Sequence, residues 1–247
     1  KGLKVIYTAH GFHFYKGSPK MNWLIYYPIE KMLSRFTDVL ITINEEDYNL
    51  AINRKFKALR IEHVKGVGVN FERFYPQTNE RKYRMREIYN YSKEAFILVY
   101  VGELSYRKNQ ESIISAISLA KRSIPDLKLL LIGDGDYYDK YKKLIMTLGV
   151  EKNVELLGYR KDVPEIMSLA DVAVSSSRQE GLPVNIMEAM AIGLPLVVSN
   201  SRGNRDLVTN YKNGIVVEIG NADELSSALV SLYKNEEMRR CYGMQSL

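Results

Sequence analysis

The sequence predicts an α/β protein built on a doubly wound parallel sheet. Short, continuously apolar segments recur along the chain, and segments of helical character separate them. Strands that are apolar on both faces are typical of a parallel sheet covered by helices on each side. Glycine or polar residues follow most of these strands, at the sheet edge where ligands bind in open α/β proteins.

The first third of the chain predicts three strands separated by two helices. The strands are expected over residues 5–9, 39–43 and 59–64. A helix opens at Ser18 and reaches about Phe36. Pro28 should kink this helix, because proline lacks an N–H and clashes with the preceding turn. Asn44 caps the second helix.

The first predicted helix combines the only tryptophan of the chain with adjacent tyrosines and flanking cations. This mixture suits a membrane surface, where aromatic rings lie at the headgroup level and Lys or Arg meets anionic lipid. The alternative is that the apolar face lies in the core of its domain. For most of the helix we favour the core.

Residues 65–76 indicate a hinge between two domains. Gly66 and Gly68 are followed by a polar segment and a proline, which is typical of a linker. We place the boundary close to residue 70, so that residues 1–70 form one domain and residues 71–247 the other.

The second domain repeats the alternation of strand and helix. Strands are expected over residues 96–101, 127–132, 154–157, 172–176, 195–199 and 214–217. Helices are expected over residues 78–91, 109–122, 136–148, 162–169, 183–192, 204–209 and 223–234. Each helix then forms a crossover of one hand between parallel strands.

Composition narrows the class of protein. At 247 residues and 46% hydrophobic, the chain can bury one large core or two modest ones. The net charge of +6 suits nucleic acid, anionic lipid or phosphorylated substrates, but no nucleic-acid motif is present. The longest apolar runs are too short to span a bilayer, and a single cysteine excludes an internal disulfide and fits a reducing cytoplasm.

The segment from Glu180 to Glu188 is the centre of the functional argument. It joins a buried strand to a helix whose start is marked by Pro183, and a helix N-terminus favours an anion such as phosphate. The two carboxylates lie about 8 Å apart along the helix axis and can accept hydroxyl protons. A nucleotide sugar, with hydroxyl groups on either side of a diphosphate, fits this layout. The alternative is a capped surface helix with two solvated glutamates.

Polar loops follow other strands at the same expected edge. Arg107 and Lys108 open a helix, where cations oppose the dipole and need either a bound anion or exposure to water. Arg160 can stack on a nucleobase. His10 follows the first strand and can donate a hydrogen bond to a sugar or an oxyanion, or it is a structural loop histidine.

These residues carry a resemblance to a known family. The spacing of Glu180 and Glu188, together with Lys108 and the loop at His10 and Gly11, resembles glycosyltransferase family four, whose members are retaining enzymes of the GT-B fold. The opening from residue 10 to 48 is more similar to bacterial enzymes of capsular and exopolysaccharide biosynthesis. The resemblance covers essentially the whole chain.

The resemblance implies a role for each matching residue. Glu180, His10 and Lys108 would be catalytic: Glu180 contacts the donor hexose, His10 touches it near the reacting carbon, and Lys108 neutralises the departing diphosphate. Glu188 would bind the ribose, and Arg160 would lie beside the base. The donor-binding set comprises Gly102, Arg107, Lys108, Arg160, Glu180, Gly181, Leu182, Pro183 and Glu188.

The sequence departs from the family pattern at two positions. Glu103 stands where family members often carry Arg, so Arg107 is the candidate for the second cation. Asp206 stands where Glu is common. Family members also have a complete first lobe, of which residues 1–70 would be the C-terminal part. The chain is therefore expected to be a fragment that retains the donor lobe, residues 71–247.

The resemblance implies transfer of a hexose from a nucleoside diphosphate sugar, with UDP favoured, to a lipid-linked saccharide with retention of configuration. It implies no metal, no other cofactor, and peripheral contact with the cytoplasmic face of the membrane. One alternative is a non-hydrolysing UDP-sugar epimerase, which needs no acceptor. Another is a catalytically silent subunit that binds nucleotide sugar.

Overall fold

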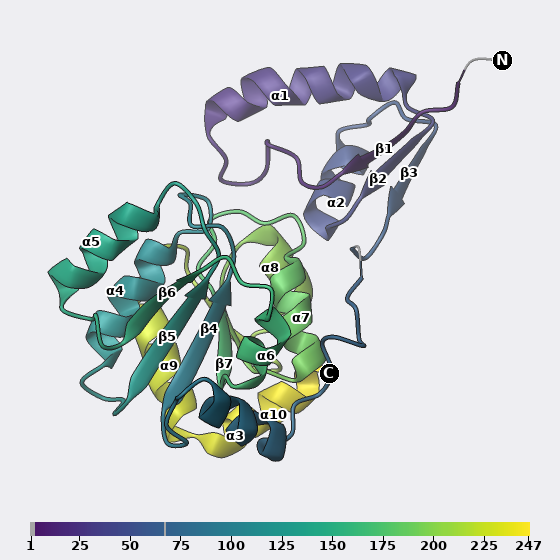
Figure 1. Cartoon of the computed structure of the whole chain (residues 1–247). Coiled ribbons are helices and arrows are strands. Elements are labelled where there is room, and N and C mark those ends of the chain that lie inside the picture. Colours follow the sequence, from purple (N-terminus) through teal and green to yellow (C-terminus); the bar gives the residue numbers. More distant parts are fainter. Residues whose placement is uncertain (1–2, 67) are drawn as a thin grey trace. The chain divides into compact units, whose positions relative to one another are not determined.

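The computed structural model describes residues 3–66 and 68–247, and their contacts divide the chain into two units (Figure 1). The first unit is Lys1–Gly68 together with Glu180–Pro183, and the second is Val69–Gln179 together with Val184–Leu247. The sequence placed a boundary near residue 70. It did not indicate that residues 180–183 would group with the first unit.

The first unit contains a parallel sheet that, in the described part of the chain, has the order β1-β2-β3. The strands are β1 (Ile6–Ala9), β2 (Val39–Thr42) and β3 (Arg60–His63). The helices are α1 (Lys20–Leu33), a 3-10 turn (Ser34–Phe36) and α2 (Glu45–Asn53). Three stacked or tilted phenylalanines, Phe12, Phe14 and Phe56, form the centre of its small core.

The sequence favoured the core for most of the apolar face of helix α1, and the described residues do not bury that face. None of its residues is buried, and only Trp23 and Tyr27 pack against the aromatic core. The helix continues through Pro28 as one element. The exposed large hydrophobic side chains of α1 and of the turn that follows it are Met21, Leu24, Ile25, Tyr26, Ile29, Met32, Leu33 and Phe36. The sequence pattern identified an apolar face correctly but could not show what that face packs against.

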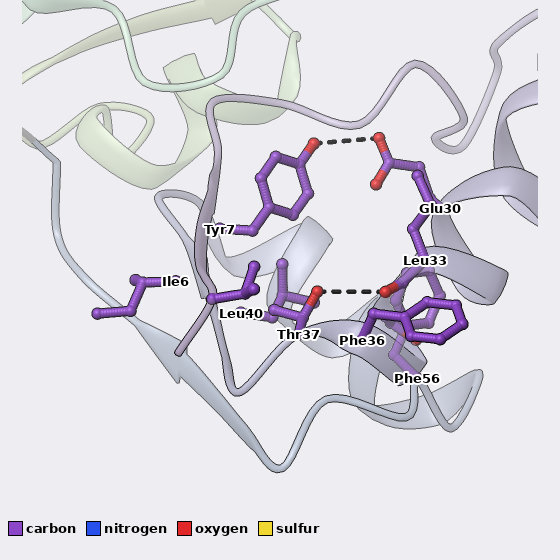
Figure 2. A pocket seen from close by; sticks show the side chains of 10 residues that line it. Ile6, Tyr7, Glu30, Leu33, Phe36, Thr37, Leu40 and Phe56 are labelled. Carbon is purple, nitrogen blue, oxygen red and sulfur yellow. Dashed lines mark hydrogen bonds between the residues drawn. The ribbon is translucent and has the colours of Figure 1, made fainter. Parts of the chain in front are cut away.

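Beside α1, the first unit contains a pocket of about 450 Å³ (Figure 2). Apolar side chains from β1, α1 and β2 line most of it, among them Ile6, Leu33 and Leu40. At one side the hydroxyl of Tyr7 donates to a carboxylate oxygen of Glu30 over 3.1 Å. Burial and the neighbouring Glu30 raise the pKa of Tyr7 to about 12.

The second unit is a parallel sheet whose order, within the described residues, is β6-β5-β4-β7-β8-β9. The strands are β4 (Phe96–Val101), β5 (Leu127–Ile132), β6 (Val154–Gly158), β7 (Val172–Ser175), β8 (Leu196–Ser199) and β9 (Gly214–Val217). The strand order reverses between β4 and β7. This confirms the doubly wound sheet and places its topological switch point between those two strands.

Helices cover both faces of this sheet (Figure 1). The helices are α3 (Asn79–Ile88), α4 (Gln110–Ala120), α5 (Tyr138–Leu148), α6 (Val163–Ser168), α7 (Val184–Ile192), α8 (Arg202–Leu207), α9 (Ala222–Lys234) and α10 (Glu236–Ser246). Alternate residues of β4 enter opposite cores: Leu98 and Tyr100 join α4, α5 and α9, whereas Ile97 and Val99 join α3, α6 and α7. This alternation is the physical reason that the strands are apolar throughout.

A buried ion pair fastens α3 to the sheet. The guanidinium of Arg86 donates to the carboxylate of Asp171 over 2.7 Å and to the carbonyl oxygens of Leu169, Lys93 and Ala95. Asp171 also accepts the backbone N–H of Ile97 at the start of β4. The charge of Arg86 is therefore buried with its donors satisfied, as a stable buried ion requires.

Candidate functional site

The loops that follow five strands of the second unit are joined to one another at the carboxyl edge of the sheet. Gly102 after β4 donates its N–H to Ile132 at the end of β5, and Gly133 donates to Gly158 at the end of β6. On the other side, Arg178 after β7 donates its N–H to the carbonyl of Arg107. A hydroxyl at the end of β8 also donates to the β7 loop. The polar loops predicted from the sequence thus form one continuous edge.

Two glycines after β5 allow this close packing. A side-chain carbon on Gly133 would lie 2.1 Å from the carbonyl oxygen of Gly102, and one on Gly135 would lie 2.5 Å from that of Leu104. Both glycines also have φ values in the region that L-residues rarely adopt. The weak glycine signal of the sequence is therefore explained by the approach of two loop backbones.

Lys108 lies in the loop between β4 and α4, with 9% of its surface exposed. Its aliphatic chain passes over Gly102, where an added side-chain carbon would be 3.4 Å from the lysine Cε. Tyr100 donates its hydroxyl hydrogen to the Lys108 carbonyl over 2.6 Å. A lysine largely removed from water at a ligand-binding edge is suited to contact an anion.

Arg107, the candidate second cation, is exposed and pairs with Glu103 over 3.8 Å. Glu103 is the residue that stands where the resemblance leads one to expect Arg. The carboxylate of Glu103 therefore lies near the guanidinium of Arg107 and partly offsets its charge. At this exposure the pair contributes little to stability.

Helix α7 starts immediately after Pro183, and its first turn is anchored to β4. The side-chain amide of Asn185 donates to the carbonyl of Val101 over 2.6 Å. The start of α7 therefore lies beside the end of β4, at the switch point, and the loop that carries Lys108 begins at the same strand end.

Glu188 lies in the second turn of α7 and is partly buried. Burial raises the pKa of Glu188, and the charge of Arg73 opposes that shift. Arg73 also donates to the carbonyl of Lys161 in the β6 loop over 3.3 Å. The sequence argument missed Arg73, because it lies in the linker and no local pattern distinguishes it from a solvated arginine.

Arg160 follows β6 and forms a two-pronged ion pair with Asp162, with its Nε 2.8 Å from a carboxylate oxygen. The hydrogen bonds from Arg160 lower the pKa of Asp162 to about 2. The hydroxyl of Tyr89 donates to the same carboxylate over 2.6 Å. The pairing fixes the plane of the guanidinium next to the sheet edge, and the predicted contact with a base stays a prediction.

The loop after β8 is built from buried polar side chains. Asn204 donates to the carbonyl of Ser199 over 2.9 Å and so closes the turn that follows the strand. Within the described residues, Ser201 Oγ and Asn204 Oδ1 are buried without a hydrogen-bond partner. Such oxygens at a ligand-binding edge are available to a ligand or to ordered water.

His10 and residues 180–183 lie in the first unit. Gly181 packs so closely on His10 that a side-chain carbon on it would lie 1.9 Å from the histidine carbonyl oxygen. The loop that begins at His10 is fixed by Asp47, whose carboxylate accepts the N–H of Phe12 over 2.9 Å. Glu180 is buried, and the side chain of His10 is exposed.

The structure therefore brings the predicted residues together in two groups. In the second unit, Gly102, Arg107, Lys108, Arg160 and Glu188 belong to one edge of one sheet. In the first unit, His10 lies next to the segment Glu180–Pro183. Neither grouping assigns a role to a residue, and the roles remain predictions.

Among the described residues, no group of three or more His, Cys, Asp or Glu side chains gathers as a metal site would require. No helix in residues 3–66 or 68–247 has the length and apolar character to cross a membrane.

Residues 82–246 match the model of the family described as glycosyl transferases group 1. EpsD of Bacillus subtilis strain 168, which is named as a glycosyltransferase, is 42% identical over 244 residues. These cover 99% of this chain and 64% of EpsD. A UDP-Gal:alpha-D-GlcNAc-diphosphoundecaprenol alpha-1,3-galactosyltransferase of Escherichia coli is 32% identical over 229 residues, covering 92% of this chain and 59% of the enzyme. The chain thus spans about three fifths of these relatives.

Among solved structures, HepE of Anabaena in complex with UDP matches with a TM-score of 0.85 at 21% identity. The match covers 98% of this chain and 66% of HepE. At that identity the likeness concerns the fold, which is the GT-B type with two parallel α/β parts. The fold predicted from the sequence is confirmed.

Proposed function

This chain belongs to the family of group 1 glycosyl transferases, and from that premise we propose that it is the donor-binding part of an enzyme that moves a hexose from a nucleoside diphosphate sugar to a lipid-linked saccharide. The observation that carries the proposal is that the Lys108 loop and the start of α7 both lie at the carboxyl end of β4, at the switch point of the sheet. One supplies a nearly buried cation and the other a set of backbone N–H groups, and both suit a diphosphate.

The remaining predicted residues would contact other parts of such a donor. We propose that Glu188 accepts hydrogen bonds from the ribose hydroxyls and that Arg160 lies against the base. Glu180 would accept from hydroxyls of the transferred sugar, with the backbone of Gly181, Leu182 and Pro183 beside it. His10 would donate to the sugar close to the reacting carbon.

In the proposed reaction the bond between the sugar carbon and the diphosphate oxygen breaks, an acceptor hydroxyl oxygen bonds to that carbon on the same face, and the hydroxyl proton passes to the departing diphosphate. Negative charge accumulates on the departing diphosphate. Lys108 and the α7 N–H groups stabilise that charge, and this stabilisation increases as the bond breaks, which lowers the barrier. In this proposal no metal is needed to neutralise the leaving group.

The names of two related proteins support UDP as the nucleotide and a lipid-linked saccharide as the acceptor. The Escherichia coli relative is named for a UDP-galactose donor and a diphosphoundecaprenol acceptor. HepE was solved with UDP and with UDP-glucose. We extend the proposal to this chain on the strength of its edge residues.

The acceptor would be reached from the membrane surface. The exposed apolar side chains of α1, including Leu24 and Ile29, are flanked by Lys20 and Lys31. An apolar stripe beside cations suits insertion at the headgroup level of an anionic membrane. We propose peripheral contact with the cytoplasmic face of the membrane through α1.

Calorimetric titration with UDP tests the proposal. The unchanged chain should bind UDP, and Lys108→Ala and Glu188→Ala should each weaken binding by about 1.5–3 kcal/mol, because each removes hydrogen bonds to a charged group. Lys128→Ala is the matched control, because Lys128 donates to the carbonyl of Lys152 at the opposite end of β5. Equal affinities in all four proteins would contradict the assignment of these residues.

A further inference from the structure

Tyr100 lies in β4, two residues before Gly102, and 1% of its surface is exposed. Its ring belongs to the apolar core between the sheet and α4. Its hydroxyl reaches out of that core and donates to the backbone carbonyl of Lys108 over 2.6 Å. The same oxygen lies 2.9 Å from the hydroxyl of Ser177.

The chemistry of a phenol fixes the direction of these two bonds. A phenol has one proton, and a carbonyl can only accept, so Tyr100 gives its proton to Lys108. Ser177 must then donate to the tyrosine oxygen. The hydroxyl of Ser177 is held in turn by that of Ser175, 3.2 Å away at the end of β7. The Lys108 carbonyl is thus linked to both strands of the switch point.

The next residue, Asn109, is held by the loop after β7, whose Ser176 hydroxyl also lies 3.4 Å from the Lys108 carbonyl oxygen. Asn109 has φ of 53°, a left-handed conformation that few residues other than glycine adopt readily. The hydroxyl of Ser176 donates to its carbonyl over 2.7 Å, and its side-chain amide donates to Ser112 and to the Ser176 carbonyl. Arg178 donates to the side-chain oxygen of Asn109 over 2.8 Å.

These contacts determine where the side chain of Lys108 starts and where it points. The Tyr100 and Ser176 hydroxyls bind two successive carbonyl oxygens, so the backbone of Lys108 and Asn109 cannot rotate without losing both bonds. The lysine chain runs past Gly102, with its Cε 3.4 Å and its Cδ 3.5 Å from the position of an added side-chain carbon. A hydroxyl in an apolar core is unfavourable unless it forms a hydrogen bond, so phenylalanine would suit the core at least as well as tyrosine.

We propose that Tyr100 is a positioning residue for Lys108: its buried hydroxyl fixes the loop that presents the lysine to the diphosphate. This inference rests on the proposed function for the identity of the ligand. The effect of Tyr100 on the loop does not depend on the proposed function, because it can be measured without ligand. The substitution Tyr100→Phe removes one oxygen and keeps the ring.

The first measurement is hydrogen exchange of backbone amides in the ligand-free chain. Tyr100→Phe should raise the exchange of residues 103–110 by roughly fivefold, as expected for the loss of one hydrogen bond. Tyr91→Phe is the matched control, because its hydroxyl is also hydrogen-bonded, 2.7 Å from Glu155, but lies outside this loop. Unchanged exchange of residues 103–110 in Tyr100→Phe would overturn the inference.

The second measurement is UDP affinity in a double-mutant cycle. Tyr100→Phe alone should weaken UDP binding by roughly fivefold, whereas Tyr91→Phe should not. In the Lys108→Ala background, Tyr100→Phe should have no further effect, because a positioning residue acts only through the group that it positions. A loss of affinity that is the same in both backgrounds would show a general structural role and would also overturn the inference.

The two measurements separate this inference from the proposed function. If the unchanged chain does not bind UDP, the proposed function fails, and the exchange of residues 103–110 still decides whether Tyr100 fixes the Lys108 loop. If UDP binds and depends on Lys108 but not on Tyr100, the proposed function stands and the positioning role is wrong.

Discussion

Glu188 and Gly133 show how single residues determine the properties of the carboxyl edge of the six-stranded sheet. Glu188 is partly buried, so its carboxylate has lost part of its hydration and its pKa is raised. Gly133 allows one loop backbone to pass against another. In both cases the neighbouring groups at this edge explain the behaviour of the residue.

We expect UDP affinity to depend on the protonation of Glu188. The carboxylate accepts ribose hydroxyls better than the protonated acid does, so affinity should rise with pH as the group ionises through its raised pKa. The linkage to stability has the opposite sign: a raised folded pKa stabilises the free protein at low pH, and this contribution is lost as pH rises through that pKa. Glu188→Gln should remove both effects in titrations across the pH range. Persistence of the affinity change in that variant would assign it to another group.

Gly133→Ala should destabilise the second unit strongly. The added methyl would lie 2.1 Å from the Gly102 carbonyl oxygen, and φ of 136° is unfavourable for alanine. Gly220→Ala separates the two causes, because Gly220 has φ of 83° with nothing within 4 Å of an added carbon. We expect about 1–2 kcal/mol for Gly220→Ala from conformation alone and a clearly larger loss for Gly133→Ala. Urea unfolding measures both, and equal losses would contradict the packing argument.

At the scale of elements, two helices differ in how they contact the protein interior. Helix α3 is mostly polar but is fastened by the buried pair of Arg86 and Asp171. Helix α1 is strongly apolar and yet has no buried residue. From hydrophobicity alone, α1 would be expected to be buried and α3 exposed. Hydrophobicity takes no account of ion pairs or of the elements that lie next to a helix.

Arg86→Leu should lower the free energy of unfolding of the second unit by about 3–5 kcal/mol. The substitution leaves three carbonyl oxygens without the guanidinium and leaves Lys82 as the one cation paired with the Asp171 carboxylate among the described residues. Lys140→Ala is the control, because its pair with Glu111 is about half exposed and should contribute no more than about 1 kcal/mol. A loss of similar size in the two variants would show that the Arg86 pair is not structural.

Helix α1 should bind anionic membranes. The chain should co-sediment with vesicles of mixed zwitterionic and anionic lipid, and Leu24→Glu should reduce binding because it places a charge in the exposed apolar stripe. Raising the salt concentration should weaken binding, since cations contribute to it. Leu119→Glu is the control, because Leu119 is an exposed leucine of α4, in the other unit. Vesicle binding that is unaffected by Leu24→Glu would refute the role of α1.

At the scale of the whole molecule, the sequence predicted the parallel sheets and most elements because the apolar strands and their glycine loops are local patterns. Helix α10 was missed because its sequence is charged and its anchoring is tertiary: Ser246 donates to the carbonyl of Leu194, and Gly243 packs against Gly193. The grouping of residues 180–183 with the first unit was also beyond local patterns, because it depends on contact with a loop 170 residues earlier.

The same limit applies to the candidate site. Loop position was sufficient to predict that Lys108 and Glu188 would share a sheet edge. The contribution of Tyr100 could not be predicted, because a tyrosine within an apolar strand has the pattern of a core residue and only the fold shows where its hydroxyl points. Arg73 was missed for a related reason, since its neighbours come from distant parts of the chain.

The measurement that tests the central claim most directly is an NMR titration of the isotopically labelled chain with UDP, read at each backbone amide. The account predicts that the largest shifts lie in residues 102–109, 158–162 and 184–188, at the carboxyl edge of the six-stranded sheet. Absence of binding, or shifts concentrated at the opposite edge around Lys82, Lys93 and Arg240, would contradict it.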